Sequence, residues 1–205
     1  MVKTAKSTSG VNRKVVSLKV TLRDTKPPVW RRLLAPGEAT LGDLHRAIQA
    51  AMGWDDCHLH TFDIEGRQYG DRRAVDDVAD ENRLTLNGLT KSGVTRFAYT
   101  YDFGDNWEHA LVIEKSLPAV EALSRPICTA GKRRCPPEDC GGPWGYRELL
   151  EVLADPAHPE HAERCEWLGE DFDPDDFNPK IADATLAARF SPAWPPRVRS
   201  ALHIA

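Results

Sequence analysis

The sequence predicts an α+β fold, with one helix packed on a mainly antiparallel sheet. Residues 15–24 and 97–113 alternate apolar and polar side chains, which is typical of half-buried strands. Between them, residues 41–52 carry apolar side chains at helical spacing. Because strands both precede and follow this helix, we expect it to lie across a single sheet.

The predicted domain begins with a hairpin followed by the helix. The strand 15–24 is followed by "TKPP" and then by "VWRRLL" at 29–34, which we expect to be the second strand. Thr40 and Asp43 have the spacing of a capping box at the helix start, and Gly53 is suited to end the helix. This order of elements favours a β-grasp-like core.

Further strands are predicted after the helix. Residues 58–64 alternate and end at a Glu-Gly turn, and residues 71–95 are a polar connection with one short element. The strongest hairpin signal follows, because residues 97–103 and 107–113 alternate on either side of a Gly-Asp-Asn turn.

Helices are predicted for the C-terminal part. Apolar residues take helical spacing over 146–156 and 158–169, and Asn178 with Pro179 is typical of a helix start at 178–190. We therefore expect a disordered lead-in (1–14), one α+β domain (15–190) and a tail (191–205). Within the domain, we expect a sheet-and-helix core (15–117), a loop rich in Cys, Pro and Gly (118–147) and a helical extension (148–190).

Composition limits the classes of function. The chain has 205 residues, and a chain of this size buries roughly 70% of its unfolded surface, so no metal is required for folding. No apolar run reaches the ~18 residues of a membrane span, and the N-terminus lacks the apolar region of a secretory signal. We expect a cytoplasmic protein with reduced cysteines, which favours metal binding over disulfides.

The charge is unevenly distributed along the chain. Residues 1–34 contain nine lysines and arginines and one acid, whereas residues 148–183 contain twelve acids and two basic residues. These segments either lie together and partly neutralise each other or form separate solvated surfaces. The acidic segment would repel phosphates, so we expect weak or no specific DNA binding.

Two motifs carry a resemblance to a known family. "YDFGDNWEH" at 101–109 and "CPPEDCGGPWGY" at 135–146, with "GW" and "HLHTF" upstream, resemble the plasmid pRiA4b ORF-3-like family from about residue 15 to 186. Some members are insertion-element passenger proteins. The resemblance implies a bacterial or archaeal protein linked to plasmids or mobile elements, and it implies no particular biochemical activity.

Three clustered cysteines suggest a zinc site. Cys128, Cys135 and Cys140 have the spacing C-x6-C-x4-C, and His109 is the first choice for a fourth ligand, ahead of His60 and His58. Thiolate and imidazole ligands suit zinc. In the alternative interpretation Cys128 and Cys140 are small buried residues that hold the loop.

Carboxylates near the two motifs allow a second interpretation. Asp102, Asp105, Glu138 and Asp139 could join His109 in a cleft that holds a divalent ion or performs acid–base catalysis. Asp105, Glu138 and Asp139 could instead serve as turn or capping residues.

Aromatic and histidine side chains near the motifs suggest a binding surface. Its candidate residues are Trp54, His58, His60, Trp107, Trp144 and Tyr146. Core packing is the alternative role for these residues.

We therefore predict an accessory protein of plasmid or mobile-element type that acts as a non-enzymatic binding module, with a structural zinc as an option. Its partner is a protein or a nucleic acid. The alternative is a metal-dependent hydrolase that uses the carboxylate and histidine cleft. The module is favoured because no nucleophile–base pair is recognisable in the sequence.

Overall fold

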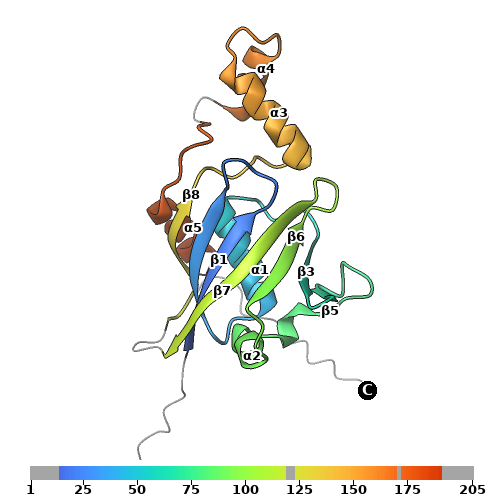
Figure 1. Ribbon diagram of the computed structural model, residues 1–205, viewed down its shortest axis with the longest axis vertical. Helices are drawn as coiled ribbons and strands as arrows, with labels where there is room; N and C mark the ends of the chain where they lie inside the picture. Colours follow the sequence, from blue (N-terminus) through green and yellow to red (C-terminus); the bar gives the residue numbers. More distant parts are fainter. Residues whose placement is uncertain (1–13, 119–122, 170–171, 191–205) are drawn as a thin grey trace, which may run out of the picture.

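The computed structural model describes residues 14–118, 123–169 and 172–190, and its strands form one sheet of eight (Figure 1). The order across the sheet is β5-β4-β3-β6-β7-β1-β2-β8. All neighbouring strands are antiparallel except β4 and β5, which are parallel. The α+β class is therefore confirmed.

Both predicted hairpins lie in this sheet. Strands β1 (Lys14–Leu22) and β2 (Trp30–Pro36) form the first, and β6 (Arg96–Tyr101) and β7 (Trp107–Pro118) form the second. They are joined because β1 also pairs with β7, so that Leu18 lies opposite Ile113. The alternate inward residues of β1 are buried in the core, as the periodicity predicts.

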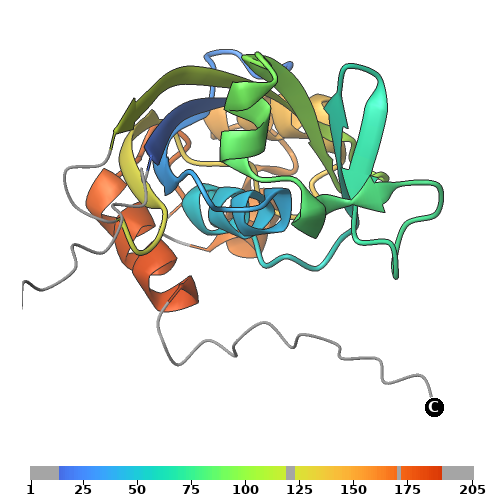
Figure 2. The ribbon, with the colours of Figure 1, turned by 90° about the horizontal axis from the view of Figure 1, so that it is seen from below.

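Helix α1 (Leu41–Met52) begins and ends where the sequence predicts. Thr40 and Asp43 form the capping box, and Gly53 ends the helix in a left-handed conformation with a φ of 93°. Leu41, Leu44 and Ile48 are fully buried in the core cluster. The helix lies across one face of the sheet (Figure 2).

A run of short elements follows α1 and completes one edge of the sheet. These are β3 (His60–Ile64), β4 (Arg67–Gly70), β5 (Ala79–Asp80), the 3₁₀ turn η1 (Glu81–Arg83) and α2 (Leu86–Lys91). The isolated bridge between Thr40 and Thr85 connects this region to the start of α1.

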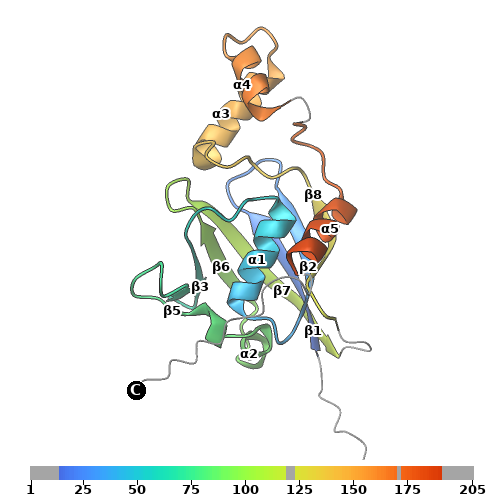
Figure 3. The ribbon, with the colours of Figure 1, turned by 180° about the vertical axis from the view of Figure 1, so that it is seen from behind.

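The C-terminal part adds one strand and three helices. They are β8 (Ile127–Lys132), α3 (Gly142–Ala154), α4 (His161–Leu168) and α5 (Pro179–Arg189). Helix α5 packs against β8 and α1 on the α1 face of the sheet (Figure 3), and Asn178 caps it as predicted. Helices α3 and α4 stand beyond one end of the sheet.

Three expectations need correction or lie outside the description. The β-grasp-like arrangement is not supported, because β8, β4 and β5 make the sheet larger than that core. The predicted loop 118–147 contains β8 and the first turn of α3, so the helical extension begins at Gly142 rather than at residue 148. The predicted lead-in and tail lie almost entirely outside the described residues, which exclude 1–13 and 191–205.

None of the helices in the described ranges has the length and apolar character needed to cross a membrane.

Candidate functional site

Three connections meet at the end of the sheet nearest α3 and bring four ionisable side chains together. His58 lies between α1 and β3, Asp102 lies directly after β6, and Glu138 and Asp139 lie between β8 and α3. The Nε2 atom of His58 is 3.6 Å from Asp102 Oδ2, 3.9 Å from Glu138 Oε2 and 3.2 Å from Asp139 Oδ1. We call these four residues the His58 cluster.

Two overlapping groups of three ligand atoms at this place are each compact enough to hold a metal ion. One group whose ligand atoms all lie within 4.8 Å of one another is His58, Asp102 and Asp139, and another is Cys57, His58 and Glu138. His58 belongs to both groups, so the cluster is centred on its imidazole.

Local backbone conformation places the two aspartates. Asp102 and Asp139 both have a φ of 55°, in the left-handed region that aspartate tolerates better than most residues. The Oδ1 atom of Asp102 accepts hydrogen bonds from the amides of Gly104 (2.9 Å) and Asp105 (3.3 Å). This Asx turn fixes the carboxylate and directs its other oxygen, Oδ2, at His58.

Tyr101 positions the other side of the cluster. Its hydroxyl accepts hydrogen bonds from the amides of Cys57 (3.1 Å) and His58 (3.3 Å) and donates one to Glu138 Oε1 (3.1 Å). Glu138 Oε1 also accepts from the amide of Asp55 at 3.0 Å. One carboxylate oxygen of Glu138 is therefore held by the protein, and Oε2 is left to face His58.

Two atoms of the cluster lack the partners that burial demands. His58 Nε2 and Glu138 Oε2 are buried and form no hydrogen bond with any described residue. Burial raises the pKa of Glu138. An unpaired buried polar atom costs about 1–3 kcal/mol, so this arrangement is suited to a group that would contact both atoms.

The cluster is open to solvent on one side. The side chain of Asp139 is 73% exposed and that of His58 is 29% exposed, whereas that of Asp102 is 9% exposed. An ion held here would be fixed by buried ligands and still be reachable from water.

A polar cleft of about 350 Å³ borders the cluster and shares His58 with it. His45 and His60 also line this cleft, with their rings stacked 3.4 Å apart. His45 Nε2 lies 2.7 Å from Asp56 Oδ1, and His60 Nε2 lies 2.8 Å from Glu81 Oε2. Burial lowers the pKa of His45, which favours its neutral form.

Most of the chain, the site included, matches one protein family. The family model that matches is that of the plasmid pRiA4b ORF-3-like proteins. The match covers residues 14–181, which include the whole His58 cluster. The chain belongs to the plasmid pRiA4b ORF-3-like family.

Relatives in this family include proteins from a bacterium and an archaeon. The protein named Uncharacterized protein y4hQ, from Sinorhizobium fredii, is 45% identical over 163 residues, which are 78% of this chain and 84% of that one. The crystal structure of MM3350, a protein of unknown function from Methanosarcina mazei Go1, superposes with a TM-score of 0.76 at 44% identity. That superposition covers 82% of this chain and 97% of MM3350.

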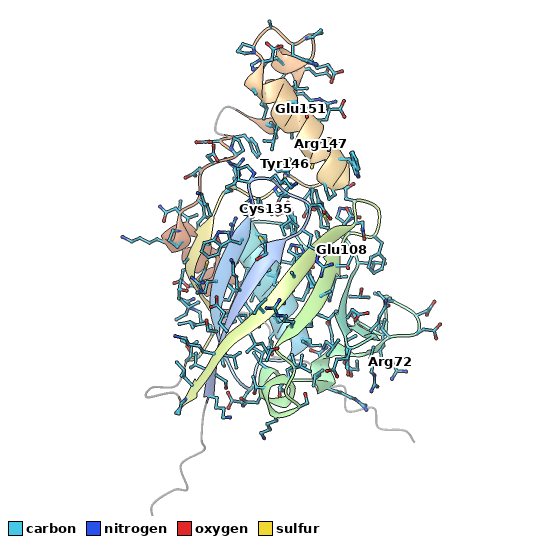
Figure 4. The ribbon with its side chains drawn as sticks, viewed as in Figure 1. Arg72, Glu108, Cys135, Tyr146, Arg147 and Glu151 are labelled. Atoms are coloured by element: carbon cyan, nitrogen blue, oxygen red, sulfur yellow. The ribbon has the colours of Figure 1, made fainter. Side chains whose placement is uncertain are left out.

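The four residues predicted to bind zinc do not lie together in a compact group. Among the described residues, no three of Cys128, Cys135, Cys140 and His109 have ligand atoms all within 4.8 Å of one another. Cys128 is buried on β8, while Cys135, which lies at the end of the sheet nearest α3 (Figure 4), is also buried. Burial raises the pKa of all three thiols, to about 12 for Cys140, and so disfavours the thiolate.

His109 is a core residue of this pRiA4b ORF-3-like protein. Its ring packs edge-on against Trp54, and its Nδ1–H donates to the carbonyl of Trp107 at 3.0 Å. Complete burial lowers the pKa of His109 to about 4. His109 is therefore separate from Asp102, Glu138 and Asp139, with which we had grouped it.

Asp105 supports the neighbouring loop, because its Oδ2 accepts from the amide of Gly141 at 3.2 Å.

The predicted binding surface divides into core and surface residues. Trp54, Trp107 and Tyr146 are buried in the core cluster. His60 is also buried but reaches the polar cleft, and Trp144 on α3 is 72% exposed. The six residues therefore do not form one patch.

Sequence reasoning missed Tyr101 and Cys57 as members of the site, and His45, Asp56 and Glu81 as residues of the cleft. The run "DDCHLH" at 55–60 is a dense group of potential ligands and could have drawn attention to Cys57 and Asp56. No comparable local signal marks His45 or Glu81, because they reach the cleft from α1 and η1.

Proposed function

We propose that this protein binds one divalent metal ion through His58, Asp102, Glu138 and Asp139, and that the ion joins three loops of a binding module. The observation that carries the proposal is a pair of buried atoms that form no hydrogen bond with any described residue, His58 Nε2 and Glu138 Oε2, which face each other beside two further carboxylates. The sequence offered a structural metal as an option, with cysteines as its ligands. In the present proposal the ligands are the residues of the His58 cluster instead.

The ligand types indicate which ions fit. Three carboxylates with one imidazole suit Mn²⁺, and they also allow Zn²⁺, which accepts nitrogen and oxygen ligands as well as thiolates. Tyr101 would act as a supporting partner, because its hydrogen bond orients the ligand Glu138 as outer hydrogen bonds do in metal proteins. The ion would also offset the repulsion among the three carboxylates.

The test is metal binding by the full-length chain after dialysis against a chelator. Isothermal titration and elemental analysis with Zn²⁺ and with Mn²⁺ are expected to give one ion per chain. His58→Gln is expected to lower the affinity by more than tenfold, because it removes the central ligand. His161→Gln is the matched control, since His161 lies on α4 outside the cluster.

Cys135→Ser separates this proposal from the cysteine site. We expect its metal affinity to match the unmodified chain. Loss of metal in Cys135→Ser, with retention in His58→Gln, would overturn the proposal and return zinc to the cysteines.

A metal-dependent hydrolase is the second candidate, favoured by the exposed side of the cluster and the adjoining cleft. A catalytic ion keeps a position open for water, whereas a structural ion is enclosed by protein ligands. The cleft, which shares His58, would place a substrate beside the ion. Turnover of p-nitrophenyl phosphate esters by the Mn²⁺-loaded chain, and its loss in His58→Gln, would support this candidate. Metal binding without turnover favours the module.

A further inference from the structure

Helices α3 and α4 form an acidic arm beyond the end of the sheet, and its charge is not neutralised by the rest of the described chain. Residues 142–168 contain six acids and two arginines, Arg147 and Arg164. Both arginines pair within the arm, with Glu151 and Glu160 respectively. Figure 4 shows Arg147 and Glu151 on α3, on the part that stands away from the sheet.

The basic N-terminal strands are neutralised elsewhere. Arg23 pairs with Glu108 and Arg32 pairs with Glu114, both on β7. Within the described ranges, no ion pair connects β1 or β2 with the arm. The interpretation in which the basic and acidic segments neutralise each other is therefore wrong for these arginines, and the arm remains free to attract a positive partner.

A groove between the two helices gives this charge a defined shape. It has a volume of about 340 Å³ and is lined by Glu148, Leu149 and Val152 from α3 and by Glu163, Arg164 and Trp167 from α4, with Asp139 and Cys140 just before α3. The charge of Arg164 is already paired with Glu160. Leu149 and Val152 form an apolar lining, and Trp167 is 49% exposed, so its indole ring can be reached from solvent.

The groove offers the contacts that a lysine or arginine side chain requires. Neither Glu148 nor Glu163 forms an ion pair or hydrogen bond with another described residue, so both carboxylates are available. The methylene groups of a cationic side chain could lie on the apolar lining. Its charge could then contact a carboxylate and the face of the indole.

We propose that the groove between α3 and α4 binds a lysine- or arginine-rich segment of a partner protein. The occupant is identified by charge complementarity, since the arm attracts a cation and repels the phosphates of a nucleic acid. The groove borders the metal site, because the proposed ligand Asp139 also lines it. The contacts proposed here are made by Glu148, Glu163 and Trp167, which are not among the proposed metal ligands.

The test is fluorescence anisotropy of the full chain with a labelled eight-residue peptide of alternating lysine and arginine. A glutamate peptide and a single-stranded DNA of matched length serve as further probes. We expect only the basic peptide to bind, with an affinity that falls as salt is raised. Binding of the DNA in preference to the peptide would overturn the proposal.

Matched variants distinguish the groove from general attraction to an acidic surface. Glu163→Gln and Trp167→Ala are each expected to weaken binding roughly fivefold to tenfold, from the loss of a charge-assisted or cation–π contact. Glu166→Gln and Trp144→Ala make the same chemical changes outside the groove and should alter the affinity less than twofold. Equal weakening by Glu166→Gln and Glu163→Gln would contradict a defined site.

The N-terminal segment of the chain itself is the competing occupant, because residues 1–13 contain Lys3, Lys6 and Arg13 and no acid. A chain that lacks residues 1–13 is compared with the full chain. Equal peptide affinity supports a partner protein. Tighter binding by the shortened chain would show that its own segment occupies the groove, and would overturn the proposal.

Discussion

Tyr101 contacts two of the four proposed metal ligands through a single hydroxyl group, so it determines how far apart they can lie. It receives the amide of His58 and donates to Glu138. Tyr101 is needed to connect the two loops, because the loop of His58 and the loop of Glu138 do not pair with each other through their backbones. The positions of the ligands therefore depend on this hydroxyl group.

Gly142 is a second residue on which the geometry of the site depends. It has a φ of 67°, and a Cβ atom here would overlap the carbonyl oxygen of Asp105, in the turn that follows Asp102. Only glycine allows the start of α3 to approach the β6–β7 turn so closely.

We therefore predict that Gly142→Ala destabilises the protein more than Gly53→Ala. Gly53 is left-handed with a φ of 93°, but no described atom lies within 4 Å of its Cβ position. Gly53→Ala should cost about 1–2 kcal/mol for the left-handed conformation alone. Gly142→Ala should cost at least about 2 kcal/mol more, from the overlap. Urea denaturation measures both values, and equal values would show that the two segments can move apart.

Arg31 connects several elements at the C-terminal end of α1. Its Nε–H donates to the carbonyl of Ala51 at 2.8 Å, and its Nη1 donates to the carbonyl of Lys132 in β8 at 3.1 Å. The ring of Phe177 lies 3.9 Å from the guanidinium carbon. Burial lowers the pKa of Arg31. The carbonyl oxygen of Ala51, in the last turn of α1, is one of the acceptors that compensate for this burial.

At the element scale we predict that Arg31→Lys costs about 3 kcal/mol of the free energy of unfolding. The guanidinium group of Arg31 donates to carbonyl oxygens of β2, α1 and β8 at the same time. The single ammonium group of lysine lacks this planar arrangement of donors, so buried carbonyl oxygens would lose their hydrogen bonds. The neighbouring Arg32→Lys is the matched control and should cost less than about 1 kcal/mol, because its pair with Glu114 lies near the surface. Similar losses from chemical denaturation of both variants would contradict this role.

The core extends over almost the whole described chain. Buried apolar residues run from Val16 in β1 to Leu186 in α5 and form one cluster. A domain of about 200 residues can be stable on such burial alone. The proposed ion lies at one end of the sheet, outside this cluster, so it would hold loops together and leave the core intact.

For the whole molecule we predict that removing metal lowers the melting temperature without abolishing folding. An ion present at about a hundredfold excess over its dissociation constant adds about 2.7 kcal/mol. In a protein of this size such a change shifts the melting temperature by roughly 5–11 °C. Scanning calorimetry should show one cooperative transition with chelator and one without it, and their melting temperatures should differ by that amount. Complete unfolding on chelation would make the metal essential to the fold.

The sequence by itself determined the features that depend on neighbours in the chain. The capping box of Thr40 and Asp43, the cap at Asn178 and the alternating strands involve residues within a few positions of one another. Local spacing and side-chain chemistry are sufficient for such features. The loop at 118–147 was the exception, because the strand "ICTAGK" has no clear alternation and is stabilised by pairing with the distant β2.

Only the tertiary structure decided the composition of the site. His58, Asp102, Glu138 and Asp139 were all named from the sequence, but they were divided between a binding surface and a cleft that included His109. His109 and Asp102 belong to the same β6–β7 hairpin but face different surroundings. His109 points into the core against Trp54, whereas Asp102 sits in a left-handed turn that faces the loop after β8. Which face a side chain takes depends on how three distant loops pack, and no local pattern in the sequence contains that information.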